Sequence, residues 1–457
     1  MLLDLSFNNF KAWESARLDF GLVTGLFGAN SSGKTTLLQF LLLLKQTKEA
    51  TDRGLSLELN GNYVNLGLFS DMIFDHDQAR SIDWSLSFRQ ENALEIFDPA
   101  AKKRSQPLVA SNLVAVRGSV SGARGAPEAR RLEYRVGSKQ SETGEQIISL
   151  ALRDKGDGFE LKSSGNQFQF SRTQGRAWPL PGPVKSYAFP DQARTYHQNA
   201  SFLSDLEASL EAALDNIYYL GPLRDYPQRD YLWARSRPQD VGKKGEKAID
   251  AILAATAAGE RRNTKFRGKL KSFQEVIAFW LTEMGLIDSF EVKEIAQGSN
   301  RWQALVRVRK DGPEALLTEV GFGVSQVLPV ITLLYYVPEN STVLLEQPEI
   351  HLHPLAQAQL ADVIINVAQR RNVQVVLESH SEHLLLRLQR RIAEQEIDAG
   401  KVKLYFCQPL GAGSKLSSLD LDLFGNIGNW PENFMGDAFG ETAAAEKARL
   451  KRLKAAE

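Results

Sequence analysis

The feature that most constrains the fold of this sequence is a glycine-rich segment near its start. Gly28 to Thr35 read Gly-Ala-Asn-Ser-Ser-Gly-Lys-Thr, a complete G-x-x-x-x-G-K-[ST] phosphate-binding loop. An apolar, β-compatible stretch precedes it, and a leucine-rich helical run from Thr36 to Leu44 follows it. The motif needs this strand–loop–helix order, because its glycines let backbone N–H groups curve around phosphate oxygens while the helix N-terminus adds a positive dipole end. The segment therefore predicts a nucleoside-triphosphate site in an α/β fold.

The loop residues have distinct expected roles toward the nucleotide. Lys34 is expected to reach the β- and γ-phosphates, and the hydroxyl of Thr35 is expected to ligate Mg²⁺. The candidate nucleotide-binding residues of this segment are Gly28, Asn30, Ser31, Ser32, Gly33, Lys34, Thr35 and Thr36.

Composition restricts the class of protein and its compartment. A chain of 457 residues is long for one hydrophobic core, so two or three lobes are expected. Lys+Arg and Asp+Glu both number 55, so the whole chain lacks the charge imbalance of a nucleic-acid-binding protein. One cysteine, Cys407, excludes an intramolecular disulfide and fits a reducing cytosol. The start has no signal-peptide pattern, and the most apolar run is too short to span a bilayer, so we expect a cytoplasmic protein with no membrane partner.

Hydrophobic periodicity divides the chain into different kinds of structure. The first twenty residues alternate, which predicts a β-hairpin leading into the loop strand. Short alternating runs separated by Gly, Ser and Pro from about Trp84 to Phe189 predict an antiparallel β subdomain. Helical spacing follows from Ser201 to Leu220 and from about Glu246 to Met284. From Phe290 onward, strands and helices alternate, and apolar strands in that pattern indicate a parallel sheet covered on both faces.

Charge is unbalanced in one region. Between Arg224 and Lys271 there are thirteen Lys/Arg and six Asp/Glu, a balance of +7. The region is either a solvated helical arm or a surface for DNA, RNA or an acidic partner. Arg224 itself is either an arginine that contacts phosphate in another subunit or a salt-bridged structural residue.

Three further segments have the residues expected of a nucleotide site. Glu346 ends the buried strand that begins at Thr342, and a carboxylate at a strand's carboxyl end beside a phosphate loop completes a Mg²⁺ shell. Upstream, the glycine-rich turn Glu319 to Gln326 opens a helix and supplies a second phosphate-binding N-terminus. Downstream, His380 follows another buried strand, where it is positioned to touch a γ-phosphate or its attacking water.

Together these motifs resemble the ATP-binding-cassette class of P-loop ATPases, in the branch with OLD, SMC and RecF-like proteins. The resemblance implies an ABC-type ATPase head of α/β class, with a mixed or parallel sheet, flanking helices, an antiparallel β subdomain and a helical insertion. It implies ATP and Mg²⁺ as cofactors, and a homodimer or higher oligomer in which one subunit's phosphate loop and the other's signature turn form each site. By resemblance, Gly321, Gly323, Ser325 and Gln326 take the signature role, Glu346 the Walker B role and His380 the switch-histidine role.

A narrower resemblance is to bacterial AAA-type ATPases of about this length that carry a C-terminal domain of unknown function. It rests on Glu346 to Pro354, on Ser379 to Arg387, on Asn429-Trp430-Pro431 and on Tyr219 to Arg224. On this view the chain divides into four parts: residues 1–200 as an N-terminal ATPase lobe, 201–288 as a helical insertion or arm, 289–410 as a C-terminal ATPase lobe and 411–457 as a tail.

One position departs from ordinary cassette ATPases. They place a catalytic glutamate directly after the Walker B acid, and that position here is Gln347. An amide cannot accept the proton of the attacking water as a carboxylate does, which removes general-base catalysis typically worth about 10²–10⁴-fold. Either Glu349, or His351 or His353, is a displaced base, or the protein hydrolyses ATP slowly and uses bound ATP as a latch; we favour the second interpretation.

Two functions fit these features. The first is an ATP-gated sensor that regulates a separate effector, a nuclease, in bacterial antiphage defence, as relatives of the Septu and retron-associated type do. The chain itself shows no acidic pattern typical of a nuclease. The second is a RecF- or SMC-like ATPase of DNA repair or recombination that binds nucleic acid through residues 224–271.

Overall fold

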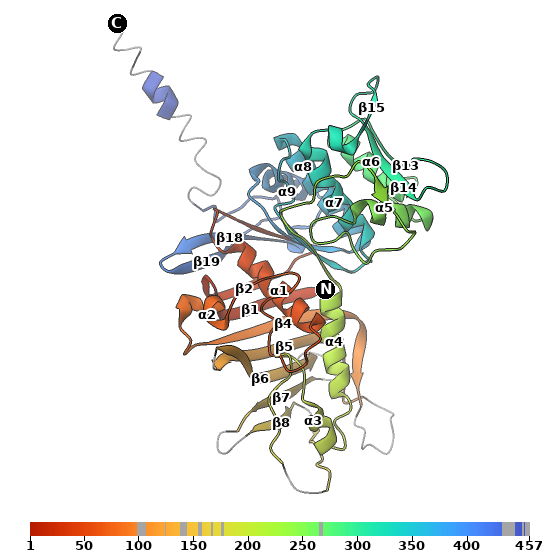
Figure 1. Cartoon of the computed structure of the whole chain (residues 1–457). Helices are drawn as coiled ribbons and strands as arrows, with labels where there is room; N and C mark the ends of the chain where they lie inside the picture. Colours follow the sequence, from red (N-terminus) through yellow and green to blue (C-terminus); the bar gives the residue numbers. More distant parts are fainter. Residues whose placement is uncertain are drawn as a thin grey trace.

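A mixed six-stranded sheet lies at the centre of the molecule and carries the phosphate loop (Figure 1). The computed structural model describes the chain except residues 98–106, 124, 138–143, 154–157, 166–167, 175–177, 265–267, 432–443, 450–451 and 453–457. Strands β9, β16, β17, β3 and β18 run parallel, and β19 pairs antiparallel with β18 at one edge. Across the described sheet the order is β19 (Gly413–Ser418), β18 (Val402–Leu410), β3 (Val23–Gly28), β17 (Gln374–Glu378), β16 (Thr342–Glu346) and β9 (Ile217–Leu220).

Both faces of this sheet are covered, which explains why its strands are apolar throughout. Successive side chains of a strand point to opposite faces. Leu345 and Leu377 accordingly belong to the core with helices α5 to α9, whereas Leu344 and Val376 belong to the core with α1, α4 and a second sheet. The helices are α1 (Lys34–Glu49), α4 (Leu203–Asp215), α5 (Ala248–Ala257), α6 (Phe273–Glu283), α7 (Phe322–Tyr336), α8 (Pro354–Arg371) and α9 (Glu382–Ala393).

The second sheet is antiparallel and forms the lower lobe in Figure 1. It confirms the predicted N-terminal hairpin, β1 with β2, and the predicted antiparallel subdomain. Its described strands, in spatial order, are β2 (Trp13–Asp19), β1 (Leu2–Phe10), β4 (Ser81–Ile96), β5 (Val109–Ala123), β6 (Ala126–Gly137), β7 (Glu145–Leu152) and β8 (Phe159–Ser164).

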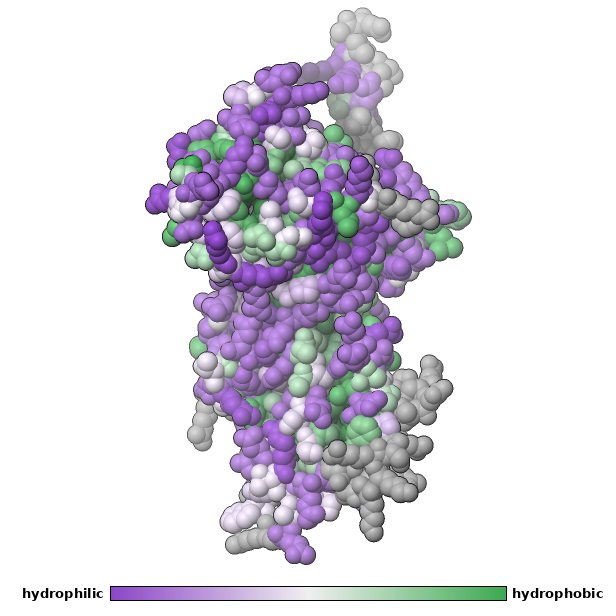
Figure 2. All heavy atoms as spheres, turned by 90° about the vertical axis from the view of Figure 1, so that its right-hand side faces the viewer, coloured by the Kyte–Doolittle hydropathy of each residue, from purple (hydrophilic) through white to green (hydrophobic). Residues whose placement is uncertain are grey.

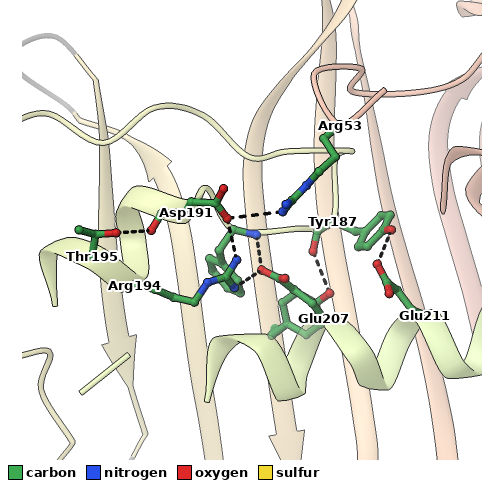
Figure 3. Close-up of polar contacts among 9 residues, drawn as sticks. Arg53, Tyr187, Asp191, Arg194, Thr195, Glu207 and Glu211 are labelled. Carbon is green, nitrogen blue, oxygen red and sulfur yellow. Dashed lines mark hydrogen bonds and ion pairs between the residues drawn. The ribbon is translucent and has the colours of Figure 1, made fainter. Parts of the chain in front are cut away.

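Polar contacts fasten α4 to the segment that precedes it (Figure 3). Glu207 Oε1 accepts hydrogen bonds from the backbone N–H of Phe189 (2.8 Å) and from the guanidinium of Arg194 (3.0 Å). The hydroxyl of Tyr187 donates to Glu211 Oε1 (2.8 Å). Helix α3 (Asp191–Tyr196) lies in this segment, so α3 and α4 close one side of the lower lobe.

Smaller elements complete the described fold. A small antiparallel sheet beside α6 joins β10 to β14, β14 to β13 and β14 to β15, and β11 pairs with β12. The bounds are α2 (Phe69–Met72), η1 (Phe74–His76), β10 (Tyr231–Leu232), β11 (Arg261–Arg262), β12 (Lys271–Ser272), β13 (Ser289–Glu294), β14 (Arg301–Arg307), β15 (Glu314–Leu316), η2 (Leu317–Glu319) and η3 (Ala399–Lys401).

The structure corrects three expectations about secondary structure. The helix predicted to reach Leu220 ends at Asp215, because Ile217–Leu220 pairs with β16 and a short apolar run fits a buried strand as well as a helix. The helical block predicted from Glu246 to Met284 is two helices, α5 and α6. Strand β19 was not predicted. The division of the chain into four parts stays a prediction.

The face of the molecule in Figure 2 is mostly polar. Hydrophilic residues cover most of the face seen in Figure 2, with apolar residues scattered over both lobes. Within the described residues, no helix combines the length and the apolar character needed to cross a bilayer.

Candidate nucleotide-binding site

The phosphate loop joins β3 to α1, as its sequence predicts. Gly28 has φ +141°, and a Cβ there would lie 2.1 Å from the carbonyl oxygen of Cys407 on the neighbouring strand β18. Gly33 has φ +85°, and its carbonyl accepts a hydrogen bond from Trp13 Nε1 (3.1 Å). Both positions therefore require glycine for reasons internal to this chain. Asn30 and Ser31 are exposed at the loop tip, while Ser32 and Thr36 are buried.

Lys34 is folded back on its own loop. Its buried ammonium donates hydrogen bonds to the carbonyls of Gly28 (3.0 Å) and Ala29 (2.7 Å). Desolvation lowers the pKa of Lys34, and the carboxylates of Glu378 and Glu349 oppose that shift. Incoming phosphate oxygens would replace the loop carbonyls as acceptors.

Two carboxylates end neighbouring strands beside the loop. The parallel register pairs Glu346 of β16 with Glu378 of β17. The hydroxyl of Thr35 donates to Glu378 Oε2 (2.7 Å), whereas Glu346 Oε1 accepts from the hydroxyl of Tyr219 (2.9 Å). The sequence analysis assigned Glu346 to the metal and missed Glu378, although Glu378 carries the same signal of an acid that ends a buried strand. The assignment of Glu346 stays a prediction, and Glu378 joins the site.

Burial dominates the electrostatics of these acids. It raises the pKa of Glu346 to about 7, helped by the nearby charge of Glu378 and opposed by the Tyr219 hydrogen bond and the charge of Arg224. Burial also raises the pKa of Glu378, against the hydrogen bond from Thr35 and the charge of Lys34. A cation in this site would offset the cost of burying these two carboxylates in their charged form.

The position after Glu346 has an unusual backbone. Gln347 has φ +44°, and its N–H donates to the carbonyl of Glu378 (2.9 Å). The buried guanidinium of Arg224 donates to the carbonyls of Glu346 (3.2 Å) and Gln347 (3.4 Å). Neither interpretation of Arg224 describes these contacts, because the side chain is directed to carbonyl groups of its own chain. Arg224 thus holds the turn at Glu346 and Gln347 through two backbone carbonyl groups.

His380 lies at the phosphate loop. Its backbone N–H donates to Glu349 Oε1 (2.8 Å), and Glu349 is buried. Desolvation and the charge of Lys34 lower the pKa of His380, while a hydrogen bond to the Gly28 backbone opposes the shift. Burial raises the pKa of Glu349. Glu349 therefore supports the His380 segment, and its role as a displaced base stays a prediction.

The predicted signature turn forms a second cluster, at the start of α7. Gly321 is the exposed N-cap, with φ −57°, and a Cβ built there meets no described atom within 4 Å. A Cβ on Gly323 would lie 3.3 Å from the carbonyl of His351, so the turn packs against the segment that follows β16. Ser325 is buried and donates to the carbonyl of Phe322 (2.9 Å), and Gln326 is also buried.

The neighbouring histidines have structural contacts. His353 caps α8, because its ring accepts a hydrogen bond from the Leu355 N–H (3.4 Å) with Pro354 at the first helical position. His351 has φ +62° and lies 6.1 Å from the ring of Phe322. Among the described residues no group of three or more His, Cys, Asp or Glu is arranged to hold a metal.

Comparison with protein families identifies the class of this site. A family model described as "AAA domain, putative AbiEii toxin, Type IV TA system" matches residues 142–387, more than half of the chain. The chain belongs to this AAA-domain family. The matched range contains β16, β17 and the start of α7. It begins after the phosphate loop, so the assignment of that loop rests on its sequence motif and on the geometry described above. A second model, "Protein of unknown function (DUF3696)", matches residues 397–444.

Three solved structures that resemble this chain in fold are heads of SMC proteins, each with a TM-score of 0.42. The SMC head domain from Thermotoga maritima is 10% identical, with 92% of this chain and 99% of that chain covered. An SMC head bound to the C-terminal winged-helix domain of ScpA is 13% identical, with 92% and 98% covered. A head with an extended coiled coil, bound to a ScpA domain derived from Pyrococcus furiosus, is 11% identical, with 92% and 96% covered. No curated protein sequence matches this AAA domain. The family match, the phosphate loop and the largely parallel sheet together define a P-loop ATPase fold of the α/β class.

Proposed function

We propose that this protein binds ATP with Mg²⁺ and hydrolyses it slowly. The observation that carries the proposal is that Lys34, Thr35, Glu378 and His380 converge at the carboxyl ends of β3 and β17. Thr35 and the acids beside the loop would hold Mg²⁺, which would supply positive charge to offset that of the phosphates. Lys34 would hold the β- and γ-phosphates, and His380 would contact the γ-phosphate.

We further propose that two copies close around composite sites, each copy supplying its α7 N-terminus to the other's nucleotide. Exposed apolar side chains surround that N-terminus. Phe322 is 57% exposed, Tyr226 is 75% exposed, and their rings pack edge to face at 5.8 Å. Such a cluster beside an open helix N-terminus suits burial against a second copy with bound phosphates.

Mixing two complementary variants tests the composite site. Lys34→Ala removes the phosphate contact, and Gly321→Glu places a charge at the signature turn without an internal clash, because a Cβ at Gly321 meets no described atom within 4 Å. Each variant is expected to lack ATPase activity, and their mixture is expected to regain part of it through heterodimers with one intact site. A chain carrying both changes is the control and stays inactive. If the mixture stays inactive while both variants fold, as judged by circular dichroism, the composite arrangement is wrong.

Slow hydrolysis is proposed from Gln347, which occupies the general-base position. Gln347→Glu is expected to raise the steady-state ATPase rate by at least about tenfold, because a carboxylate at that position accepts the water's proton. Gln347→Ala is the control and should keep the slow rate. An unchanged rate in Gln347→Glu would instead support another base, with Glu349 the first candidate.

The biological role we propose is a nucleotide-gated regulator of a separate effector, a nuclease, in bacterial antiphage defence. The family description names a toxin and a toxin–antitoxin system, which supports a role in conflict or defence. Co-purification of the native complex with and without ATP tests it. A nuclease captured in an ATP-dependent manner supports the proposal, and recombination proteins would support the alternative, a RecF- or SMC-like DNA-repair ATPase.

The basic region, residues 224–271, gives little support to the alternative of a RecF- or SMC-like DNA-repair ATPase. Several of its cations are paired locally: Arg229 with Glu319, Arg237 and Arg262 with Glu260, and Lys244 with Asp225. Lys265 and Arg267 lie outside the described residues. These pairs occupy the cationic groups with carboxylates, so the same groups are less available to phosphate oxygens.

A further inference from the structure

The order of strands puts two acids at different distances from the phosphate loop. Strand β17 lies between β3 and β16, so Glu378 is one strand away from the loop strand and Glu346 is two strands away. With a strand spacing of about 4.8 Å, Glu346 starts roughly 10 Å from β3. The acid nearer to the loop is therefore not the one that the Walker B pattern marks.

The contacts of the two acids agree with this difference. Thr35 Oγ1 donates to Glu378 Oε2 at 2.7 Å. A hydroxyl has one proton and two acceptor lone pairs, so donation to Glu378 turns the lone pairs of Thr35 toward the opposite side. Those lone pairs are what a hard cation binds.

Glu378 is held rigidly, as a residue that orients another must be. Its side chain is buried, and its carbonyl accepts the N–H of Gln347 (2.9 Å). The next residue, Ser379, donates its N–H to the carbonyl of Leu26 on β3 (3.0 Å). The backbone that carries the Glu378 carboxylate is thus hydrogen-bonded to the segments on both sides of β17.

Glu346 has other partners. The hydroxyl of Tyr219 donates to it at 2.9 Å, and the ring of Tyr219 packs edge-on against Tyr63 at 6.3 Å. The hydroxyl of Tyr63 in turn donates to Glu49 (3.2 Å). This chain of contacts holds Glu346 from the side of β9, away from Thr35.

We propose that Glu378 is a positioning residue for the metal: it orients the Thr35 hydroxyl toward nucleotide-bound Mg²⁺, a task separate from the Walker B role that the sequence pattern assigns to Glu346. The proposal rests on the proposed binding of ATP and deepens it, because it divides the two carboxylates between different tasks. The site fits Mg²⁺, because the Thr35 hydroxyl and the carboxylates beside it supply the oxygen atoms that Mg²⁺ prefers, together with phosphate oxygens of the nucleotide.

The test measures the affinity for a fluorescent ATP analogue in EDTA and in Mg²⁺. In the wild type, Mg²⁺ is expected to tighten binding. Glu378→Met removes the acceptor at similar volume and is expected to reduce this Mg²⁺ enhancement by about 10-fold or more, the usual effect of losing a residue that orients a metal ligand. Glu378→Gln keeps a carbonyl acceptor and is expected to lose less. The matched change at the neighbouring strand, Glu346→Met, is expected to reduce the enhancement less than Glu378→Met does.

A second readout separates orientation from loss of structure. With Mn²⁺ in place of Mg²⁺, electron paramagnetic resonance of the nucleotide complex should show weaker retention of the ion in Glu378→Met while binding in EDTA is retained. The proposal is overturned if Glu346→Met loses the enhancement and Glu378→Met keeps it. If the wild type binds no ATP analogue with or without Mg²⁺, the proposed function fails as well; if it binds normally and the Glu378 variants match it, this inference alone fails.

Discussion

Replacing Glu346 with glutamine is expected to stabilise the protein at alkaline pH and to have little effect at acidic pH. Burial is the main cause that raises the pKa of Glu346 from 4.5 to about 7. A carboxyl group whose pKa is raised by folding binds its proton more tightly in the native state. Its contribution to stability is complete below the unfolded pKa and is lost as the pH rises through the folded pKa.

The magnitude follows from the size of that shift. One pKa unit corresponds to about 1.4 kcal/mol, so a rise from 4.5 to about 7 corresponds to roughly 3 kcal/mol in the free energy of unfolding. Glutamine does not ionise, so Glu346→Gln avoids this loss. The variant should therefore be more stable than the wild type by only about 1 kcal/mol near pH 5, and by up to roughly 3 kcal/mol near pH 8.5.

Urea unfolding without nucleotide or metal, followed by circular dichroism at several pH values, measures this difference. The wild type and the variant share the other buried acids, so comparing them at each pH isolates Glu346. Tyr219→Phe is the companion variant: it removes the hydrogen bond that lowers the pKa of Glu346, so its loss of stability should be larger and should extend to higher pH. A difference between Glu346→Gln and wild type that is the same at pH 5 and pH 8.5 would refute the reasoning.

Two further predictions concern the framework of the site. Gln374→Leu is expected to reduce the free energy of unfolding by about 3 kcal/mol or more. The Gln374 amide accepts from the backbone N–H of Leu2 and donates to the carbonyls of Leu2 and Gly21, and the variant loses these three buried hydrogen bonds. Chemical denaturation measures the loss, and a value below about 1 kcal/mol would contradict the prediction. Gly28→Ala is expected to lower the midpoint of thermal unfolding and to abolish ATP binding, because its Cβ would lie 2.1 Å from the Cys407 carbonyl oxygen. Gly321→Ala should leave the midpoint unchanged, since a Cβ there meets no described atom within 4 Å. Equal midpoints for the two variants would contradict this prediction.

Much of the framework follows from local sequence patterns. The phosphate loop needs left-handed glycines at fixed spacing between a strand and a helix, and the structure has φ +141° at Gly28 and φ +85° at Gly33. The strands that end at Glu346 and Glu378 could be predicted from their apolar sequences, because strands of a sheet covered on both faces are apolar on both sides. Alternation in the first twenty residues likewise predicted the hairpin of β1 and β2. In each case the information lies within about twenty neighbouring residues.

The partners of the site side chains depend on contacts between distant parts of the chain. Thr35 meets Glu378, 343 residues later, because β17 inserts between β3 and β16, and strand order is set by how the helices cross over the sheet rather than by any pattern within a strand. The same holds for Arg224, which reaches the carbonyls of Glu346 and Gln347 after β9 pairs with β16. Sequence periodicity shows which residues end strands at the site, and the packing of the whole sheet decides which of those residues touch.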